Sequence, residues 1–140
     1  VFFAFGEANG GGKNWGTNAI GYITQSSSTT SGFNATGSFT GNNITASSST
    51  NKMGAVITYQ DNAGTNALNT DIVLQLSADG GSNYSTATMT ALPDFSTGIK
   101  MAKVNDLSVT AGTSLKYKIS FANQASGSKE ARIRGVSLQY

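Results

Sequence analysis

The chain has 140 residues with neither cysteine nor histidine, which excludes disulfides, cysteine-based metal sites and serine-histidine-acid catalysis. Only 11% of the residues are charged, whereas an average soluble protein has about 25%. The net charge of +2 is too small to indicate nucleic-acid binding, and no apolar stretch approaches the roughly 20 residues of a membrane helix. A single domain with a polar, uncharged surface is expected to be extracellular or on a virion.

Apolar residues alternate with polar ones in short runs separated by Gly, Asn, Asp and Ser, a pattern typical of strands and turns. The predicted strands cover residues 1–5, 18–24, 33–40, 53–60, 70–77, 84–91, 98–104, 114–122 and 131–140. This spacing predicts an all-β fold, an antiparallel β-sandwich or jelly roll of about eight or nine strands. Residues 1–12 are expected to be an apolar strand with a Gly-rich hinge, and residues 13–140 the sandwich domain.

The first predicted strand is the apolar pentamer Val1-Phe2-Phe3-Ala4-Phe5, which is followed by a Gly-rich segment over residues 6–12. Such a strand would promote aggregation unless it is docked. It is expected either to form an edge strand of its own domain or to enter a neighbouring subunit by strand addition. Because the sequence begins with Val, it is expected to be processed or to start within a longer protein.

Two predicted strands have one apolar face each. Leu115, Tyr117, Ile119 and Phe121 alternate with polar residues, and so do Ile72, Leu74 and Leu76, which predicts that both sets point into the core.

The last strand changes phase, because Ile133 is odd-numbered whereas Val136, Leu138 and Tyr140 are even-numbered. A β-bulge near residues 134–135 would place all four on the core side.

Two segments rich in Gly, Asn and Asp, residues 61–66 and 79–83, are predicted to connect hairpins. Asp61, Asp71 and Asp79 lie in or beside such loops and could supply oxygen ligands to calcium if the loops converge, with Asp61 and Asp79 as the weak candidates, and the alternative is that they only form turns. Residues 77–84 resemble in part the Asp-box hairpin of sialidase-type propellers, which supports a hairpin and implies no activity.

Several surface positions are candidates for contact with carbohydrate. Trp15 and Tyr84 lie beside Gly/Asn-rich loops and are either sugar-stacking platforms or ordinary packing residues. Asn34, Asn43 and Asn83 begin N-x-S/T sequons, which are glycosylation sites in a secreted eukaryotic protein and otherwise a product of composition.

The charged residues do not predict an enzyme. The seven acidic residues are scattered singly, without a close pair of the kind used in glycoside hydrolysis. Lys116 and Lys118 would share one strand face and Arg132 and Arg134 another, giving either a mildly basic patch or an ordinary solvated face. No catalytic residue, metal or cofactor is expected.

The second half, over residues 74–84, 120–124 and 131–140, resembles the C-terminal β domains of fibre and structural proteins of aquatic bacteriophages. The resemblance covers roughly residues 70–140 and implies homotrimeric or polymeric fibres that contact a host surface, often its glycans. It carries over no catalytic residue.

The expected function is that of a non-enzymatic subunit of an extracellular or virion fibre or filament. Such a subunit would form a homo-oligomer or homopolymer through sheet edges, helped by Val1–Phe5, and contact cell-surface glycans. The alternative is a monomeric carbohydrate-binding module that uses Trp15 or Tyr84.

Overall fold

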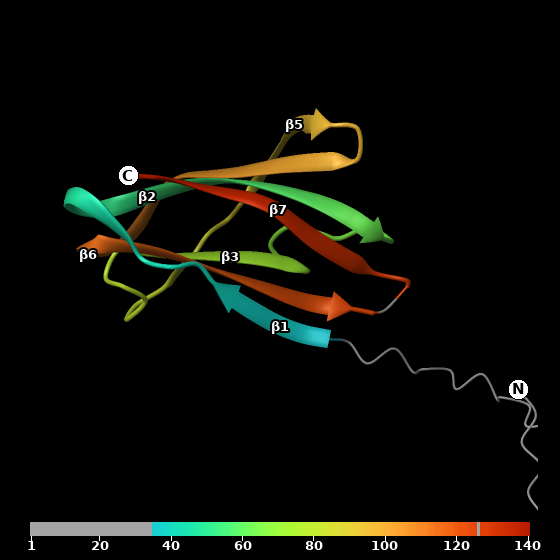
Figure 1. Cartoon of the computed structure of the whole chain (residues 1–140), viewed down its shortest axis with the longest axis horizontal. Coiled ribbons are helices and arrows are strands. Elements are labelled where there is room, and N and C mark those ends of the chain that lie inside the picture. Colours follow the sequence, from blue (N-terminus) through green and yellow to red (C-terminus); the bar gives the residue numbers. More distant parts are fainter. Residues whose placement is uncertain (1–34, 126) are drawn as a thin grey trace, which may run out of the picture. The chain divides into compact units, whose positions relative to one another are not determined.

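The computed structural model describes residues 35–125 and 127–140 (Figure 1). This part of the chain is all-β and contains no helix, and therefore no helix able to cross a membrane. Its seven strands are β1 (Ala35–Thr40), β2 (Ile44–Ala63), β3 (Ile72–Ser77), β4 (Ser85–Thr86), β5 (Thr90–Ser96), β6 (Ile99–Gln124) and β7 (Glu130–Gln139). The predicted strands 1–5 and 18–24 lie outside the described residues.

All pairings between the strands are antiparallel, and β1 and β2 run one after the other along β6. β1 pairs with residues 118–124 of β6, and β2 pairs with residues 100–115. The short link 41–43 joins β1 to β2 and keeps both on the same partner. The two long segments therefore form one two-stranded ribbon.

The remaining strands extend this ribbon on both sides. β3 pairs with the second half of β6 and carries β4 on its other edge. β5 pairs with the first half of β6, and β7 pairs with β2. The seven strands thus form one antiparallel sheet with the order β4-β3-β6-β2-β7, in which β1 and β5 also pair with β6. Within it, two groups of strands, β1-β6-β3-β4 and β5-β6-β2-β7, share β6 (Figure 1).

The ribbon is folded over, because the two ends of β6 lie close to each other. Lys100, at its start, binds Asp61, which binds Asn66, which in turn binds Gln124 at the end of β6. A straight strand of 26 residues would extend roughly 80 Å. β6 therefore turns back on itself near its middle (Figure 1).

The hydrophobic core is built from side chains of both groups of strands. These side chains form a single buried cluster. The largest fully buried apolar ones are Met53, Ile57, Ile72, Leu74, Leu76, Leu115 and Ile119. Burial of apolar area is the main favourable term in folding, so each half of the ribbon stabilises the other through this shared core.

The predicted core faces are largely confirmed. Ile72, Leu74 and Leu76 are each 0% exposed, and Leu115 and Ile119 are buried, with Tyr117 and Phe121 packed against the core.

The predicted C-terminal bulge is confirmed as well. Thr58 pairs with Gly135 but Tyr59 pairs with Ile133, which leaves Arg134 as the additional residue. Ile133, Val136 and Leu138 pack on the core as expected, but the prediction for Tyr140 was wrong. Its side chain is 59% exposed because it follows the last paired residue of β7.

Three other strand predictions need correction. Residues 84–91 do not form a single strand, because the chain passes here from β4 in one group to β5 in the other. Ala87 and Met89 are buried along this crossing. Residues 61–66 do not connect a hairpin, since β2 and β3 do not pair. Residues 44–52, which are mostly polar, belong to β2, where they pair with β6 in an irregular register and only Ala46 among them joins the core.

Candidate functional site

The sequence-predicted site residues are distributed over the molecule and do not form one site. Val1–Phe5, Trp15 and Asn34 lie outside the described residues. Asp61, Asp79, Tyr84, Asn43 and Asn83 are described, and each has a different environment.

Asp79 forms the turn between β3 and β4. Its carboxylate accepts hydrogen bonds from the backbone N–H of Asn83 (3.0 Å), the Asn83 side-chain amide (2.8 Å) and the Ser77 hydroxyl (2.7 Å). The backbone bond from Asn83 is the strongest of the contacts that lower the pKa of Asp79 to about 2. Gly80 and Gly81 adopt the left-handed conformation (φ 76° and 93°), which glycine tolerates best. The predicted hairpin is thus confirmed.

Asp61 lies in a different part of the molecule, where it forms an ion pair with Lys100. Its carboxylate lies 2.6 Å from Lys100 Nζ and accepts the side-chain amide of Asn66 at 2.7 Å. Burial acts to raise the pKa of Asp61, but the hydrogen bonds from Lys100 and Asn66 outweigh it and leave the pKa below its ordinary value.

The two candidate calcium ligands do not converge. Asp79 bridges to Ser114, whereas the network around Asp61 reaches Gln124, ten residues farther along β6 and roughly 30 Å away. Within residues 35–125 and 127–140, no three acidic side chains gather as metal ligands.

Tyr84 is half-buried beside the two lysines of β6. Lys118 Nζ lies 6.0 Å from the centre of the Tyr84 ring, at the outer limit of a cation–π contact. The Tyr84 hydroxyl and the Lys116 side chain both lie over Gly81, where a Cβ would be 2.8 Å and 3.2 Å from them. Tyr84 therefore packs against the turn at Gly81 but stays partly accessible, and its role as a stacking platform remains a prediction.

The two described sequons differ. Asn43 is exposed, whereas the side-chain nitrogen of Asn83 donates to Asp79 at 2.8 Å. A glycan on Asn83 would replace a hydrogen on that nitrogen and disturb the turn.

A buried carboxylate, which the sequence indicated only as a possible third calcium ligand, lies just before β3. The side chain of Asp71 is 2% exposed and accepts hydrogen bonds from Lys129 (2.7 Å), the backbone N–H of Ala67 (2.7 Å) and Asn123 (2.9 Å). The bond from Lys129 contributes most to a pKa of about 2. This carboxylate stays ionised because every one of its contacts favours the charged form.

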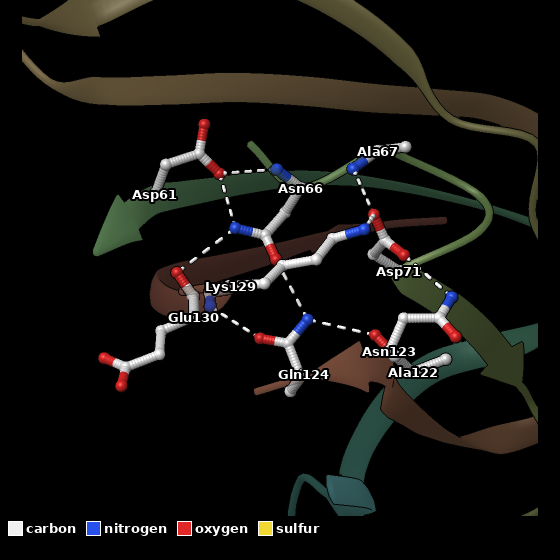
Figure 2. A network of polar contacts seen from close by, with 10 residues as sticks. Asp61, Asn66, Ala67, Asp71, Ala122, Asn123, Gln124, Lys129 and Glu130 are labelled. Carbon is white, nitrogen blue, oxygen red and sulfur yellow. Dashed lines mark hydrogen bonds and ion pairs between the residues drawn. The ribbon is translucent and has the colours of Figure 1, made fainter. Parts of the chain in front are cut away.

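Asn66, itself only 3% exposed, extends this cluster (Figure 2). Its amide nitrogen donates to Asp61 and to the carbonyl of Glu130, and its oxygen accepts from Gln124 at 2.9 Å. No buried side-chain polar atom among the described residues lacks a partner. We name Asp61, Asn66, Asp71, Asn123, Gln124, Lys129 and Glu130 the polar clasp. Because its members bind one another, its role is to join the β2–β3 connection to the β6–β7 turn.

A pocket of about 450 Å³ lies at the other end of the β2–β7 pair. Its lining residues are Thr50, Lys52, Met53, Gly54, Asn105, Asp106, Gln139 and Tyr140. Its volume falls in the range of roughly 300–1,000 Å³ that is common for ligand sites. None of these residues was predicted as a binding residue, although Asn105-Asp106 inside a strand is a sequence signal for a bulge or turn.

Comparisons with protein-family models, curated proteins and solved structures give no match for this chain. Inferences about its function therefore depend on its own geometry.

Proposed function

We propose that the chain is a non-enzymatic structural subunit of an extracellular or virion fibre or filament, which self-assembles through the edges of its sheets. The folded ribbon with one core shared by its halves supports a β-sandwich or jelly-roll description. In that description, β1, β4, β5 and β7 are the edge strands. The observation that carries the proposal is the unequal protection of these edges.

Three of the edges carry features that oppose pairing with another chain. β4 has two residues, and β5 contains Pro93, which cannot donate a ladder hydrogen bond. β7 carries Glu130, Arg132 and Arg134 and is bulged at Arg134. Charges, proline, short length and bulges are the usual means of blocking edge-to-edge association.

β1 is protected only by its modest length and by one irregularity in its pairing with β6, between Ala35 and Gly37. Its sequence, Ala35–Thr40, contains no charge and no proline. Phe39, 40% exposed, lies against Tyr117 and Phe121 with ring centres 6.2 Å and 6.1 Å apart. A strand added from a second copy would gain main-chain hydrogen bonds at β1 and cover this exposed ring.

The strand that is added is proposed to be the apolar segment Val1–Phe5 of a second copy. Its β-prone sequence and the Gly-rich residues after it support strand donation. The polar, uncharged composition supports an extracellular or virion location, and the absence of histidine and cysteine supports a function without catalysis.

The first test compares the solution mass and negative-stain appearance of the intact chain with those of a version lacking residues 1–10. We expect oligomers or filaments from the intact chain and monomers from the shortened one. If both are monomeric, the fibre proposal is wrong and a monomeric carbohydrate-binding module, favoured by the pocket near Tyr140, takes its place.

A second test introduces Gly37→Lys into the intact chain. No atom lies within 4 Å of the position of a Cβ at Gly37, so the side chain fits while placing a charge on the β1 edge. We expect assembly to be lost. Ser137→Lys, which adds the same charge to the exposed β7 edge, is the matched control and should assemble normally. Equal assembly of both variants would contradict the choice of β1.

A further inference from the structure

The pocket of about 450 Å³ is formed where β6 bulges opposite a glycine of β2. Met53 pairs with Leu107 and Ala55 with Val104, so the single residue Gly54 lies opposite both Asn105 and Asp106. β-Bulges redirect side chains and are frequent next to binding sites. The additional residue in β6 thus brings two polar side chains to the rim of the pocket.

Gly54 is one of the residues that line the pocket. On its other side it pairs with Gln139 of β7. A Cβ at Gly54 would lie 3.0 Å from the Val104 carbonyl oxygen and 3.2 Å from the Gln139 side-chain oxygen. The place of a side chain at Gly54 is thus already occupied by this carbonyl and by the Gln139 side chain, and glycine permits the close approach of β2, β6 and β7 beside the pocket.

Asp106 has an unusual backbone conformation. Its φ of 52° lies in the left-handed region, which strains the backbone of a non-glycine residue. Such strain is concentrated at functional sites. Asn69 and Asn123 also have positive φ, but their side chains are committed to Met89 and Asp71.

By comparison, several polar side chains that line the pocket have no hydrogen-bond or ion-pair partner among the described residues. They are the side chains of Lys52, Asn105, Asp106 and Gln139. Tyr140 adds an aromatic ring that is 59% exposed at the same rim. Donors, acceptors and an aromatic face therefore converge on one pocket and remain available to a ligand.

We propose that this pocket binds a neutral sugar residue. The ammonium of Lys52 and the carboxylate of Asp106 balance each other, which disfavours a charged ligand, and the ammonium opposes a metal ion. The amides of Asn105 and Gln139 match vicinal hydroxyls, which both donate and accept. The Tyr140 ring can lie against the apolar face of a pyranose. This site goes beyond the proposed assembly function, because it is complete within one copy.

The test is a calorimetric or NMR titration of the intact chain with neutral oligosaccharides of glucose, galactose, mannose and N-acetylglucosamine. We expect at least one series to bind, and Asp106→Asn and Tyr140→Ala each to weaken binding about ten-fold or more, because each removes a direct contact. Asn tolerates the left-handed conformation, so Asp106→Asn preserves the bulge.

Asp94→Asn and Phe95→Ala are the matched controls, since they change an exposed carboxylate and an exposed aromatic ring outside the pocket, and they should bind as the unmodified chain does. Absence of binding to all four series, binding only to anionic sugars, or unchanged binding by Asp106→Asn and Tyr140→Ala would overturn the proposal. Sedimentation of the same samples reports assembly separately, so the sugar site and the fibre can fail independently.

Discussion

The polar clasp and the pocket at Gly54 lie at opposite ends of the β2–β7 pair, and they use polar side chains in opposite ways. In the clasp, Asp71 and Asn66 are buried and every partner is another part of the chain. In the pocket, the side chains of Asp106 and Lys52 make no hydrogen bond or ion pair with another described residue. Polar side chains that bond to other parts of the chain, as in the clasp, indicate a structural role. Polar side chains without such partners, beside a strained residue in a pocket, favour a role in ligand binding.

The comparison predicts that Asp71→Ala lowers the free energy of unfolding more than any other change considered. This change leaves Lys129, the Ala67 N–H and the Asn123 amide without their acceptor, and removal of one member of a buried ion pair commonly costs about 3–5 kcal/mol. Because Lys129 is about one-third exposed, we expect about 3 kcal/mol, measured by urea unfolding. Asp94→Ala, an exposed control, should change the free energy of unfolding by less than about 0.5 kcal/mol.

The polar clasp should also make the free energy of unfolding depend on pH in the acidic range. The pKa of Asp71 is about 2 in the folded chain and 3.8 ordinarily, so its contribution is present above pH 3.8 and is lost as the pH falls through 2. The shift corresponds to about 2 kcal/mol. We expect the free energy of unfolding to fall across this window and the fall to be smaller in Asp71→Asn. An equal fall in both chains would show that other carboxylates, such as Asp61 and Glu130, dominate.

A pair of glycine substitutions compares the two ends directly, because Asn123 and Asp106 both have positive φ. Asn123→Gly relieves backbone strain but removes the 2.9 Å bond to Asp71, so we expect a net loss of about 1 kcal/mol in unfolding measurements. A gain in stability would mean that the strain outweighs the hydrogen bond.

The smallest expected change in the free energy of unfolding is that of Asp106→Gly. It relieves the same kind of strain without breaking a contact to a described residue, so the free energy of unfolding should stay unchanged or rise by about 0.5 kcal/mol. Measured beside Asn123→Gly, it tests whether Asp106 is retained for binding and not for stability. A marked loss of stability would place Asp106 with the clasp residues.

The sequence determined the features that depend on neighbouring residues. Alternation placed Ile72, Leu74 and Leu76 in the core, the change of phase located the bulge at Arg134, and the Asp79 turn followed from its Gly and Asp content. These predictions held because strand periodicity and turn chemistry are local properties.

Tertiary structure alone decided the features that depend on distant pairing. Residues 44–52 became part of a strand because β6 lies beside them, and residues 84–91 divided because the chain passes from one strand group to the other. The pocket likewise joins Gly54, Asp106 and Gln139 from three strands that are far apart in the sequence. Hydrogen-bond ladders and sites of this kind form only when the ribbon folds over, and no local pattern encodes that fold.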